Sequence, residues 1–494
     1  MDIEQFIEFC DPQNIDGIKP VKLGKLCQDS REVAAGDIFI AVKGYKSDGH
    51  IFIREAVDRG ASVVITERQL SGNNEFLALQ VKNTRNLLGP LAQLIAGNPA
   101  QKLTIIGVTG TNGKTTVSTI IWQILTKLGL KASLLGTVEK RVNNDVYNSL
   151  LTTSDPIELA CDMKQMVEAG SKYLVMEVSS HALSQQRVRG IPFKVAVFTN
   201  LSHDHLDYHE SMNDYASAKR KLFNSLDEKS WAVTNFDDSR GEWIINSTPA
   251  KILSFSFKGK GLFKADIVTA DAAGSVILLD DIKIKTPLVG TFNAYNVIEA
   301  LLACTALGLD GTRAADALTT CTGAPGRMER VNVSVKNSRE PLVFVDYAHT
   351  PNALENVAST LDALKGSTQK LIIIFGCGGD RDKTKRPLMA EIAERIADEV
   401  IITSDNPRTE DPDSIIDEIM QGFRNQQSAT RITSRHHAIT NTILQADNNS
   451  LVLIAGKGHE TYQEINGVRT HFDDREVALK ALKIRNSQNK ERVG

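Results

Sequence analysis

Short apolar runs rich in Val, Ile and Leu recur along the chain and are separated by segments with the spacing of amphipathic helices. Runs of this length are typical of buried strands, and their alternation with helices is typical of an open, mostly parallel sheet. The clearest runs occupy residues 38–42, 61–65, 103–106, 173–176, 195–198, 343–345, 371–375, 400–402 and 451–455. The pattern therefore predicts the α/β fold class.

Two turn-rich clusters divide this pattern into three parts. The first is Gly97-Asn98-Pro99, and the second is the segment at residues 323–329. Clusters of Gly and Pro between periodic segments mark loops, and 494 residues suit about three domains. We predict a small N-terminal α/β domain at residues 1–98, a central, mostly parallel sheet domain at 99–330, and a Rossmann-like C-terminal α/β domain at 331–494.

The strongest functional signal is the stretch at residues 103–116. Its apolar run enters a glycine-rich loop, and a helical pattern begins at Lys114. Glycines let backbone N–H groups approach phosphate oxygens, the helix start and Lys114 add positive charge, and the Thr115 hydroxyl suits Mg²⁺. The common phosphate-loop spacing requires a glycine where this chain has Val108, but the strand-loop-helix context still predicts a triphosphate site.

Polar residues follow two further strand-like runs. Glu177 ends the run at 173–176, and three histidines and two aspartates lie within residues 203–209. Carboxylates at the carboxyl ends of parallel strands are suitable Mg²⁺ ligands. No cysteine accompanies the histidines, so we favour a nucleotide-bound Mg²⁺ over zinc.

Composition narrows the function classes. Lys and Arg number 57 and Asp and Glu 60, a net charge of −3, which gives no broad basic surface for nucleic acid or anionic membranes. The six cysteines include no CxxC pair, which favours a reducing compartment over a disulfide framework. The first residues lack a leader pattern, and no apolar run is long enough to span a bilayer. We expect a soluble, cytoplasmic enzyme.

Together these motifs resemble the Mur ligase family of ATP-dependent amide-bond-forming enzymes, over essentially the whole chain and in matching order. The resemblance rests on the segment at 109–115, Glu177, Asn200, Asp204-His205, Asn293, Arg327 and Asp346-Tyr347-Ala348-His349. It implies a ligase of peptidoglycan precursor synthesis that forms an acyl phosphate and then an amide. We expect a monomer, although the sequence does not determine the oligomeric state.

The resemblance also implies the nucleotide and metal sites. The ATP site would contain Gly110, Thr111, Asn112, Gly113, Lys114, Thr115, Thr116, Asn293, Arg327 and Asp346. The Mg²⁺ ligands would be Thr115, Glu177, His205 and Lys219, the last as a carbamate, and Lys114, Lys219 and His205 would be catalytic. The general base is left unassigned.

Two substrate sites follow from the same resemblance. UDP-N-acetylmuramoyl-L-alanyl-D-glutamate would contact Ser30, Tyr45, Lys46, Ser47, Thr152, Thr153, Ser179, Gln185 and Arg187. Gln28 and Leu151 depart from the family pattern next to these contacts. The amino acid would lie among Arg381, Asp405, Asn406, Pro407, Arg408, Gly456 and Glu460.

The segment Asp405-Asn406-Pro407-Arg408 resembles that of family members that add meso-diaminopimelate. This amino acid is lysine with a second α-carboxylate, which Arg408 could bind with a bidentate fork. Two alternatives remain open at this stage: a ligase of the same family that adds lysine, and a nucleotide-gated binding protein that is not a ligase.

Overall fold

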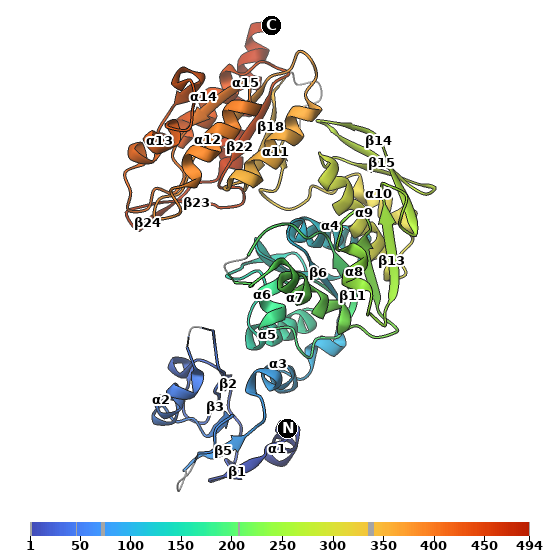
Figure 1. Ribbon diagram of the computed structural model, residues 1–494, viewed down its shortest axis with the longest axis vertical. Coiled ribbons are helices and arrows are strands. Elements are labelled where there is room, and N and C mark those ends of the chain that lie inside the picture. Colours follow the sequence, from blue (N-terminus) through green and yellow to red (C-terminus); the bar gives the residue numbers. More distant parts are fainter. Residues whose placement is uncertain (1, 46, 71–74, 206–207, 334–339, 494) are drawn as a thin grey trace. The chain divides into compact units, whose positions relative to one another are not determined.

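The computed structural model describes residues 2–45, 47–70, 75–205, 208–333 and 340–493 (Figure 1). The chain divides into two compact units, which are described separately below. The first contains Met1–Ser256, Lys260–Phe263 and Leu302–Leu309, and the second contains Phe257–Gly259, Lys264–Leu301 and Asp310–Gly494. Both units combine helices with largely parallel sheets, which confirms the predicted α/β class.

The N-terminal sheet of the first unit has the strand order β1-β5-β4-β3-β2, and only β1 is antiparallel to its neighbour. Strands β3 and β4 are buried along their whole length, which explains their continuous apolar sequences. The elements are α1 (Ile3–Cys10), β1 (Asn14–Asp16), β2 (Leu26–Cys27), η1 (Ser30–Glu32), β3 (Ile38–Ile40), η2 (Gly49–Phe52), α2 (Ile53–Asp58), β4 (Val63–Thr66), β5 (Leu77–Gln80) and α3 (Thr84–Ile95).

The second sheet of this unit runs in the order β13-β12-β11-β6-β10-β7-β8-β9, with β8 and β9 antiparallel. Its central strand β6 leads into the predicted phosphate loop, and its neighbours β10 and β11 end at the same edge. The strands are β6 (Thr104–Thr109), β7 (Ala132–Leu135), β8 (Glu139–Val142), β9 (Asp145–Asn148), β10 (Tyr173–Glu177), β11 (Phe193–Phe198), β12 (Trp231–Asn235) and β13 (Lys251–Ser256). The helices are η3 (Pro99–Lys102), α4 (Lys114–Lys127), α5 (Pro156–Glu168), α6 (Ser180–Ser184), α7 (Met212–Asn224) and α8 (Gly241–Ile245).

The second unit begins with an antiparallel meander and two helices. The meander comprises β14 (Phe263–Asp271), β15 (Gly274–Leu279) and β16 (Ile282–Thr286). Helix α9 (Thr291–Ala306) contributes residues to both units, and α10 (Gly311–Leu318) packs against β16.

The main sheet of the second unit has the order β17-β18-β22-β19-β20-β21, with only β17 antiparallel. Alternate residues of β19 lie in two different apolar clusters, so both faces of the sheet are covered. The strands are β17 (Glu329–Val331), β18 (Leu342–Asp346), β19 (Leu371–Phe375), β20 (Glu399–Ile402), β21 (Ala429–Arg431) and β22 (Leu451–Ala455). The helices are α11 (Pro351–Leu364), α12 (Lys385–Ile396), α13 (Pro412–Met420), η4 (Gln426–Ser428), α14 (Arg435–Gln445) and α15 (Asp474–Val493).

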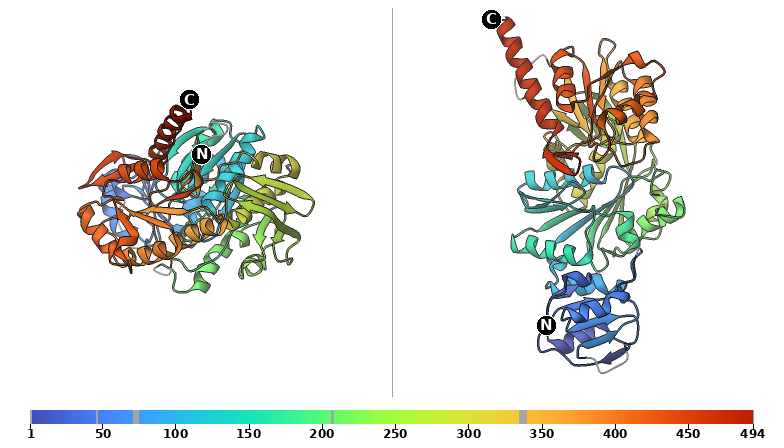
Figure 2. Two further views of the ribbon diagram at one scale, coloured as in Figure 1. Left: turned by 90° about the horizontal axis from the view of Figure 1, so that it is seen from above. Right: turned by 90° about the vertical axis from the view of Figure 1, so that its left-hand side faces the viewer.

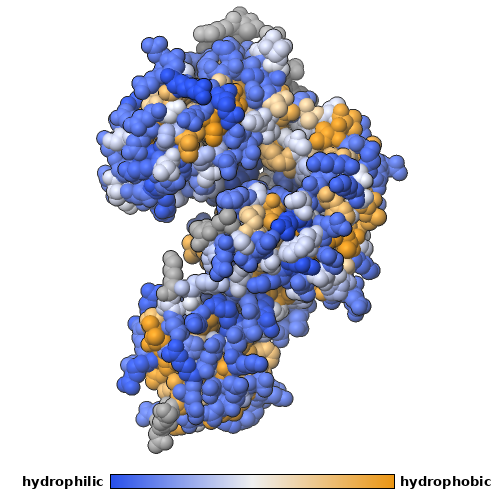
Figure 3. Space-filling model, in the orientation of Figure 1, coloured by the Kyte–Doolittle hydropathy of each residue, from blue (hydrophilic) through white to orange (hydrophobic). Residues whose placement is uncertain are grey.

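A hairpin of β23 (Tyr462–Ile465) and β24 (Val468–His471) follows the last parallel strand. It lies at one end of the main sheet of the second unit, and the last turns of α15 project away from that sheet (Figure 2). The face drawn in Figure 3 is largely hydrophilic, with apolar residues in separate patches. Among the described residues, no helix is both long enough and apolar enough to cross a membrane.

Candidate active site

The phosphate loop connects β6 to α4 and depends on its glycines. A Cβ at Gly110 would lie 1.8 Å from the Thr199 hydroxyl, so no larger residue fits there. Gly113 has φ of 85°, the left-handed region that glycine adopts without strain. Asn200 supports the loop, because its carbonyl accepts the Thr111 N–H at 2.8 Å and its side chain accepts the Asn112 N–H at 3.0 Å. The predicted loop is therefore formed as a strand-loop-helix unit.

Lys114 and Thr116 occupy the first turn of α4 beside this loop. The Lys114 ammonium donates to the carbonyls of Gly110 at 3.0 Å and Thr111 at 2.8 Å. Thr116 is buried, whereas Asn112 is exposed. The cation is thus held over the loop, where a phosphate chain would need it.

Glu177, at the end of β10, is fully buried and lies next to the loop. Its Oε2 accepts the Thr115 hydroxyl at 3.0 Å and the Thr137 hydroxyl at 3.0 Å, while Oε1 accepts the Thr137 N–H at 2.7 Å. The Thr137 hydroxyl also lies 3.0 Å from that of Thr152. Thr137 thereby joins the predicted metal ligands to a predicted substrate contact.

A second chain of hydrogen bonds continues from the same strand. The Thr153 hydroxyl donates to the Glu177 carbonyl at 2.9 Å and accepts the Ser179 N–H at 3.1 Å. Arg187 donates to the Thr153 carbonyl at 2.8 Å and to the Gln185 side chain at 2.8 and 3.0 Å. The structure therefore brings together all five predicted muramoyl-dipeptide contacts of the central part of the chain. Leu151, the departure from the family pattern, is half exposed beside them.

Lys219, on α7, is 1% exposed and reaches the phosphate loop. Its Nζ lies 2.7 Å from the Gly110 carbonyl and 4.2 Å from the Tyr215 ring centroid. Burial, together with the nearby charge of Lys114, holds the pKa of Lys219 well below its usual value. This amine is adjacent to the loop but accessible to very little solvent.

His205 lies in a group of aromatic rings that also contains His181, Tyr208 and Tyr215. Its ring centroid is 5.0 Å from that of His181 and 5.9 Å from that of Tyr215, and its backbone has φ of 54°. The ring centroid of Tyr208 lies 4.0 Å from that of His181, with the two rings tilted by 41°, and the Tyr208 hydroxyl accepts the Gln185 amide at 3.3 Å. This group connects the predicted metal ligand His205 to the muramoyl-dipeptide contacts.

The predicted nucleotide contacts of the N-terminal part are less closely grouped. Tyr45 is mostly exposed and packs on Tyr208, with ring centroids 5.2 Å apart. Ser30 is buried and donates to Glu55 at 2.8 Å, whereas Ser47 is exposed in the turn closed by the Gly44 N–H. Lys46 lies outside the described residues. Gln28 is half buried at the end of β2.

In the second unit, the predicted nucleotide contact Asp346 ends β18 and is buried. It accepts the N–H groups of Met328 at 2.6 Å and Ala348 at 2.8 Å, and burial raises its pKa. The Arg327 guanidinium lies 4.8 Å from the Tyr347 ring centroid. Asn293 is buried within α9 and donates to the Val289 carbonyl at 2.8 Å, so its amide has a structural role in this state.

The predicted amino-acid site also lies in the second unit and is formed by loops at the ends of parallel strands. Asn406 donates to Glu460 at 2.8 Å, and a Cβ on Gly456 would lie 2.9 Å from the Asp405 carboxylate. Asp405, Asn406 and Pro407 are buried, whereas Glu460 remains partly exposed. The loops at 405–408 and 456–460 therefore form one compact site.

Arg408 is held by the hairpin β23–β24. Its N–H donates to the Glu464 carbonyl at 3.0 Å, its carbonyl accepts the Asn466 N–H at 2.6 Å, and its φ is 52°. Its Nη1 donates to the Gly379 carbonyl at 2.6 Å. A guanidinium has five N–H donors, so this bond leaves others for a carboxylate.

An ion-pair network around the buried Arg386 supports the neighbouring loop at 376–381. Arg386 is fully buried and binds Glu410 at 3.0 Å, Glu418 at 2.7 Å and the Gly378 carbonyl at 3.2 Å. The hydrogen bond from Arg386 lowers the pKa of Glu410 to about 2. Arg381 ends this loop and is exposed. A Cβ on Gly378 would lie 3.0 Å from Arg408 Nη1 and 3.9 Å from Arg381 Cγ, so both arginines border this glycine.

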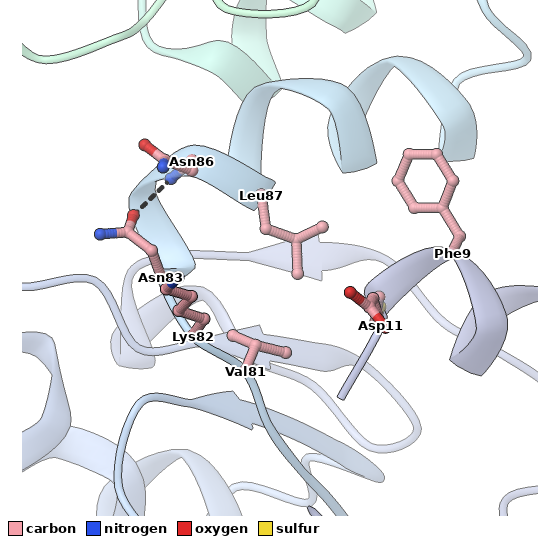
Figure 4. Close-up of a pocket in the computed structure, with 8 residues that line it drawn as sticks. Phe9, Asp11, Val81, Lys82, Asn83, Asn86 and Leu87 are labelled. Atoms are coloured by element: carbon pink, nitrogen blue, oxygen red, sulfur yellow. Dashed lines mark hydrogen bonds between the residues drawn. The ribbon is translucent and has the colours of Figure 1, made fainter. Parts of the chain in front are cut away.

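A separate pocket lies between the end of α1 and the start of α3. Figure 4 shows Leu87 and Val81 pointing into it, and Asn83 capping α3 through the Asn86 N–H at 2.7 Å. None of the predicted site residues lines it. It is therefore not part of the candidate active site.

Sequence reasoning missed Thr137 and Lys457, both of which contact predicted site residues. Thr137 is the second residue after β7, and Lys457 is the second residue after β22. The usable signal was their position at the carboxyl ends of parallel strands, where open sheets bind ligands.

The donor set fits Mg²⁺. The Thr115 hydroxyl and the Glu177 carboxylate are oxygen ligands 3.0 Å apart, and Mg²⁺ commonly takes one or two protein carboxylates and keeps several waters. In the described ranges, no three His, Cys, Asp or Glu side chains are placed to hold a metal among themselves.

Comparison with known proteins covers nearly the whole chain. Residues 108–304 match the Mur ligase middle domain, residues 326–458 the Mur ligase glutamate ligase domain, and residues 25–97 the Mur ligase family catalytic domain.

Relatives match at full length. The UDP-N-acetylmuramoyl-L-alanyl-D-glutamate--2,6-diaminopimelate ligase of Cytophaga hutchinsonii is 39% identical over 98% of this chain and 99% of its own, and that of Geobacillus kaustophilus is 43% identical over 92% and 94%. A solved structure of a ligase of the same name matches with a TM-score of 0.69 and 36% identity, over 93% of this chain and 94% of that one. This chain belongs to the Mur ligase family.

Proposed function

We propose that this protein is the ATP-dependent ligase that adds meso-2,6-diaminopimelate to the γ-carboxylate of UDP-N-acetylmuramoyl-L-alanyl-D-glutamate in peptidoglycan precursor synthesis. The names of the full-length relatives support this activity. In this proposal, residues 1–98 bind the uridine end, 99–330 bind ATP and 331–494 bind the amino acid. The proposal includes a cytoplasmic location, because its substrates are nucleotides.

One observation carries the proposal. Thr115, Glu177, Thr137 and Thr152 form one hydrogen-bonded chain. It runs from the phosphate loop to the contacts assigned to the muramoyl dipeptide. A phosphoryl donor and a carboxylate acceptor bound at its two ends would be neighbours, which is what transfer of phosphate to a carboxylate requires.

The first step of the proposed reaction joins two anions, a carboxylate and a phosphate. The D-glutamyl γ-carboxylate attacks the γ-phosphate of ATP to give an acyl phosphate and ADP. Lys114 offsets the negative charge that both reactants bring to this point. The neutral amine of diaminopimelate then attacks the acyl carbon, a proton leaves the nitrogen, and phosphate departs from the tetrahedral intermediate.

Mg²⁺ would be held by Thr115 and Glu177, with His205 and a carbamylated Lys219 as further ligands. When bound, it would screen the phosphate charges. Lys219 supports this assignment because it is buried against Gly110, and a neutral amine is the form that combines with CO₂. Mass spectrometry of the intact protein under CO₂ would test the carbamate.

The amino-acid assignment rests on Arg408 and Glu460. Arg408 supplies the cation that a second carboxylate needs, and Glu460 is placed to receive an ammonium group. Arg381 stays in this proposal as a further carboxylate contact, since it borders Gly378 as Arg408 does.

The deciding experiment measures phosphate release with ATP, the UDP-muramoyl dipeptide and a panel of amino acids. We expect turnover only when both the dipeptide and meso-diaminopimelate are present. Equal turnover with lysine would favour the lysine-adding alternative. Slow hydrolysis that needs neither acceptor would favour a nucleotide-gated binding protein.

A further inference from the structure

Lys457 is a fully buried lysine in the second unit that the proposed chemistry does not use. It follows β22 between Gly456 and Gly458, whose φ values of 114° and 53° belong to the left-handed region. A Cβ on Gly458 would lie 2.6 Å from the Tyr347 Cβ, so the turn that carries Lys457 is tightly packed. A buried lysine costs free energy unless its ammonium group is paired.

The partners of this ammonium group are residues assigned to the amino acid. Its Nζ lies 3.0 Å from Asn406 Oδ1, 3.3 Å from Glu460 Oε2 and 3.6 Å from Asp405 Oδ1. Its fourth neighbour is the Tyr462 ring, 5.4 Å from Nζ to the centroid. One buried cation therefore touches both loops that form the amino-acid site.

These contacts fix the orientation of Asn406. Its Oδ1 accepts from Lys457 and from the Glu464 N–H at 3.0 Å, while its Nδ2 donates to Glu460 Oε2 at 2.8 Å. With two donors on one side and an acceptor on the other, the amide has a single favourable orientation. The bonds from Lys457 and Asn406 to Glu460 both end on Oε2, which leaves Oε1 as the oxygen to face a ligand.

Charge gives Lys457 a second role. Asp405 and Glu460 are two carboxylates in a largely buried site, and the amino acid brings carboxylates of its own. Without a cation between them, the two protein carboxylates would repel each other and the incoming substrate. Lys457 offsets one of these charges while itself remaining covered.

We propose that Lys457 is a positioning residue for the amino-acid substrate, which sets the orientation of Asn406 and the position of Glu460 Oε1 before the substrate binds. This inference takes the identity of the amino acid from the proposed function. The role of Lys457 does not depend on that identity.

The test is Lys457→Met in the full-length protein, which keeps the length of the side chain and removes its charge. We expect the KM for diaminopimelate to rise about 30-fold, with kcat and the KM values for ATP and the UDP-muramoyl dipeptide within about 2-fold of wild type. The control is Arg485→Met, which removes a cation of similar burial that binds the carbonyls of Ile443 at 2.7 Å and Leu444 at 2.9 Å. It should lower Tm without changing the KM for the amino acid.

A Lys457→Met enzyme with a lower Tm but a wild-type KM for the amino acid would overturn the proposal, since the lysine would then only support the fold. If Lys457→Met does not fold, Lys457→Gln carries the same prediction. If wild type uses another amino acid instead, the substrate assignment fails, and the role of Lys457 is judged on the KM for that amino acid.

Discussion

The candidate phosphate site in the first unit and the candidate amino-acid site in the second, the two halves of the proposed catalytic machinery, are built by different physical means. The phosphate loop at 107–116 is one continuous segment, and it offers a phosphate chain its backbone N–H groups and the Lys114 cation. The amino-acid site is assembled from separate loops at 376–381, 405–408 and 456–466, and its charged side chains are fixed by other buried charges. The phosphate loop can be recognised from one stretch of sequence, although Thr199 and Asn200 also contact it. The amino-acid site depends on tertiary structure throughout.

This difference separates the expected consequences of mutation. Loss of a phosphate-loop group should reduce the rate of the chemical step, because its charge acts on the transferring phosphoryl group. Loss of a group in the amino-acid site should mainly change affinity and selectivity, because that site recognises a substrate before it reacts.

The largest expected effect is that of Lys114→Met. Removing the cation over the loop should lower kcat by on the order of a thousand-fold, measured as phosphate release with both acceptors present. Lys127→Met, an exposed lysine in the last turn of the same helix, is the matched control and should keep full activity. A kcat of Lys114→Met within ten-fold of the wild-type value would contradict the proposed difference between the phosphate loop and the amino-acid site.

Arg408→Ala should have the next largest effect, and only on the amino acid. Loss of the guanidinium should raise the KM for diaminopimelate about 100-fold and leave any activity with lysine unchanged, because lysine lacks the second carboxylate. Competition assays with both amino acids give the ratio directly. The control is Arg424→Ala, in the same unit and outside the site, which should leave the ratio of activities with the two amino acids unchanged. An equal loss of activity with lysine would mean that Arg408 supports the loop and does not bind the second carboxylate.

The same contrast explains what the sequence could predict. The loop from Gly110 to Thr116 could be identified because strand, glycines and helix are adjacent in the chain. The contacts of Arg408 with Glu464 and of Asn406 with Lys457 join residues more than fifty positions apart, and no local pattern encodes them. Family resemblance supplied Arg408, but it did not supply Lys457 or Thr137, whose roles depend on which strand ends are neighbours. The predicted domain boundaries remain predictions.

Thr137→Val tests whether the first half also depends on tertiary structure. The substitution removes the hydroxyl that links Glu177 to Thr152 and keeps the backbone bond to Glu177 at 2.7 Å. We expect kcat/KM for the UDP-muramoyl dipeptide to fall about 10-fold, the usual consequence of losing one such hydrogen bond. Thr137→Ser keeps the hydroxyl and should retain most of the activity. Equal losses in both variants would point to packing of the methyl group.

The smallest effect concerns the ion pair between buried Arg386 and partly exposed Glu410, which supports the amino-acid site. The pKa of Glu410 is about 2 in the folded protein against an ordinary 4.5, so its ionised form stabilises the fold above pH 4.5, and this contribution is lost as the pH falls toward 2. The difference in unfolding free energy between wild type and Glu410→Gln, from urea titrations, should therefore be constant at neutral pH and shrink between pH 4.5 and 2. Glu399→Gln, a carboxylate exposed to solvent, should show a much weaker trend. A difference that does not change with pH would show that the geometry of the glutamate, and not its charge, holds the loop beside Arg408.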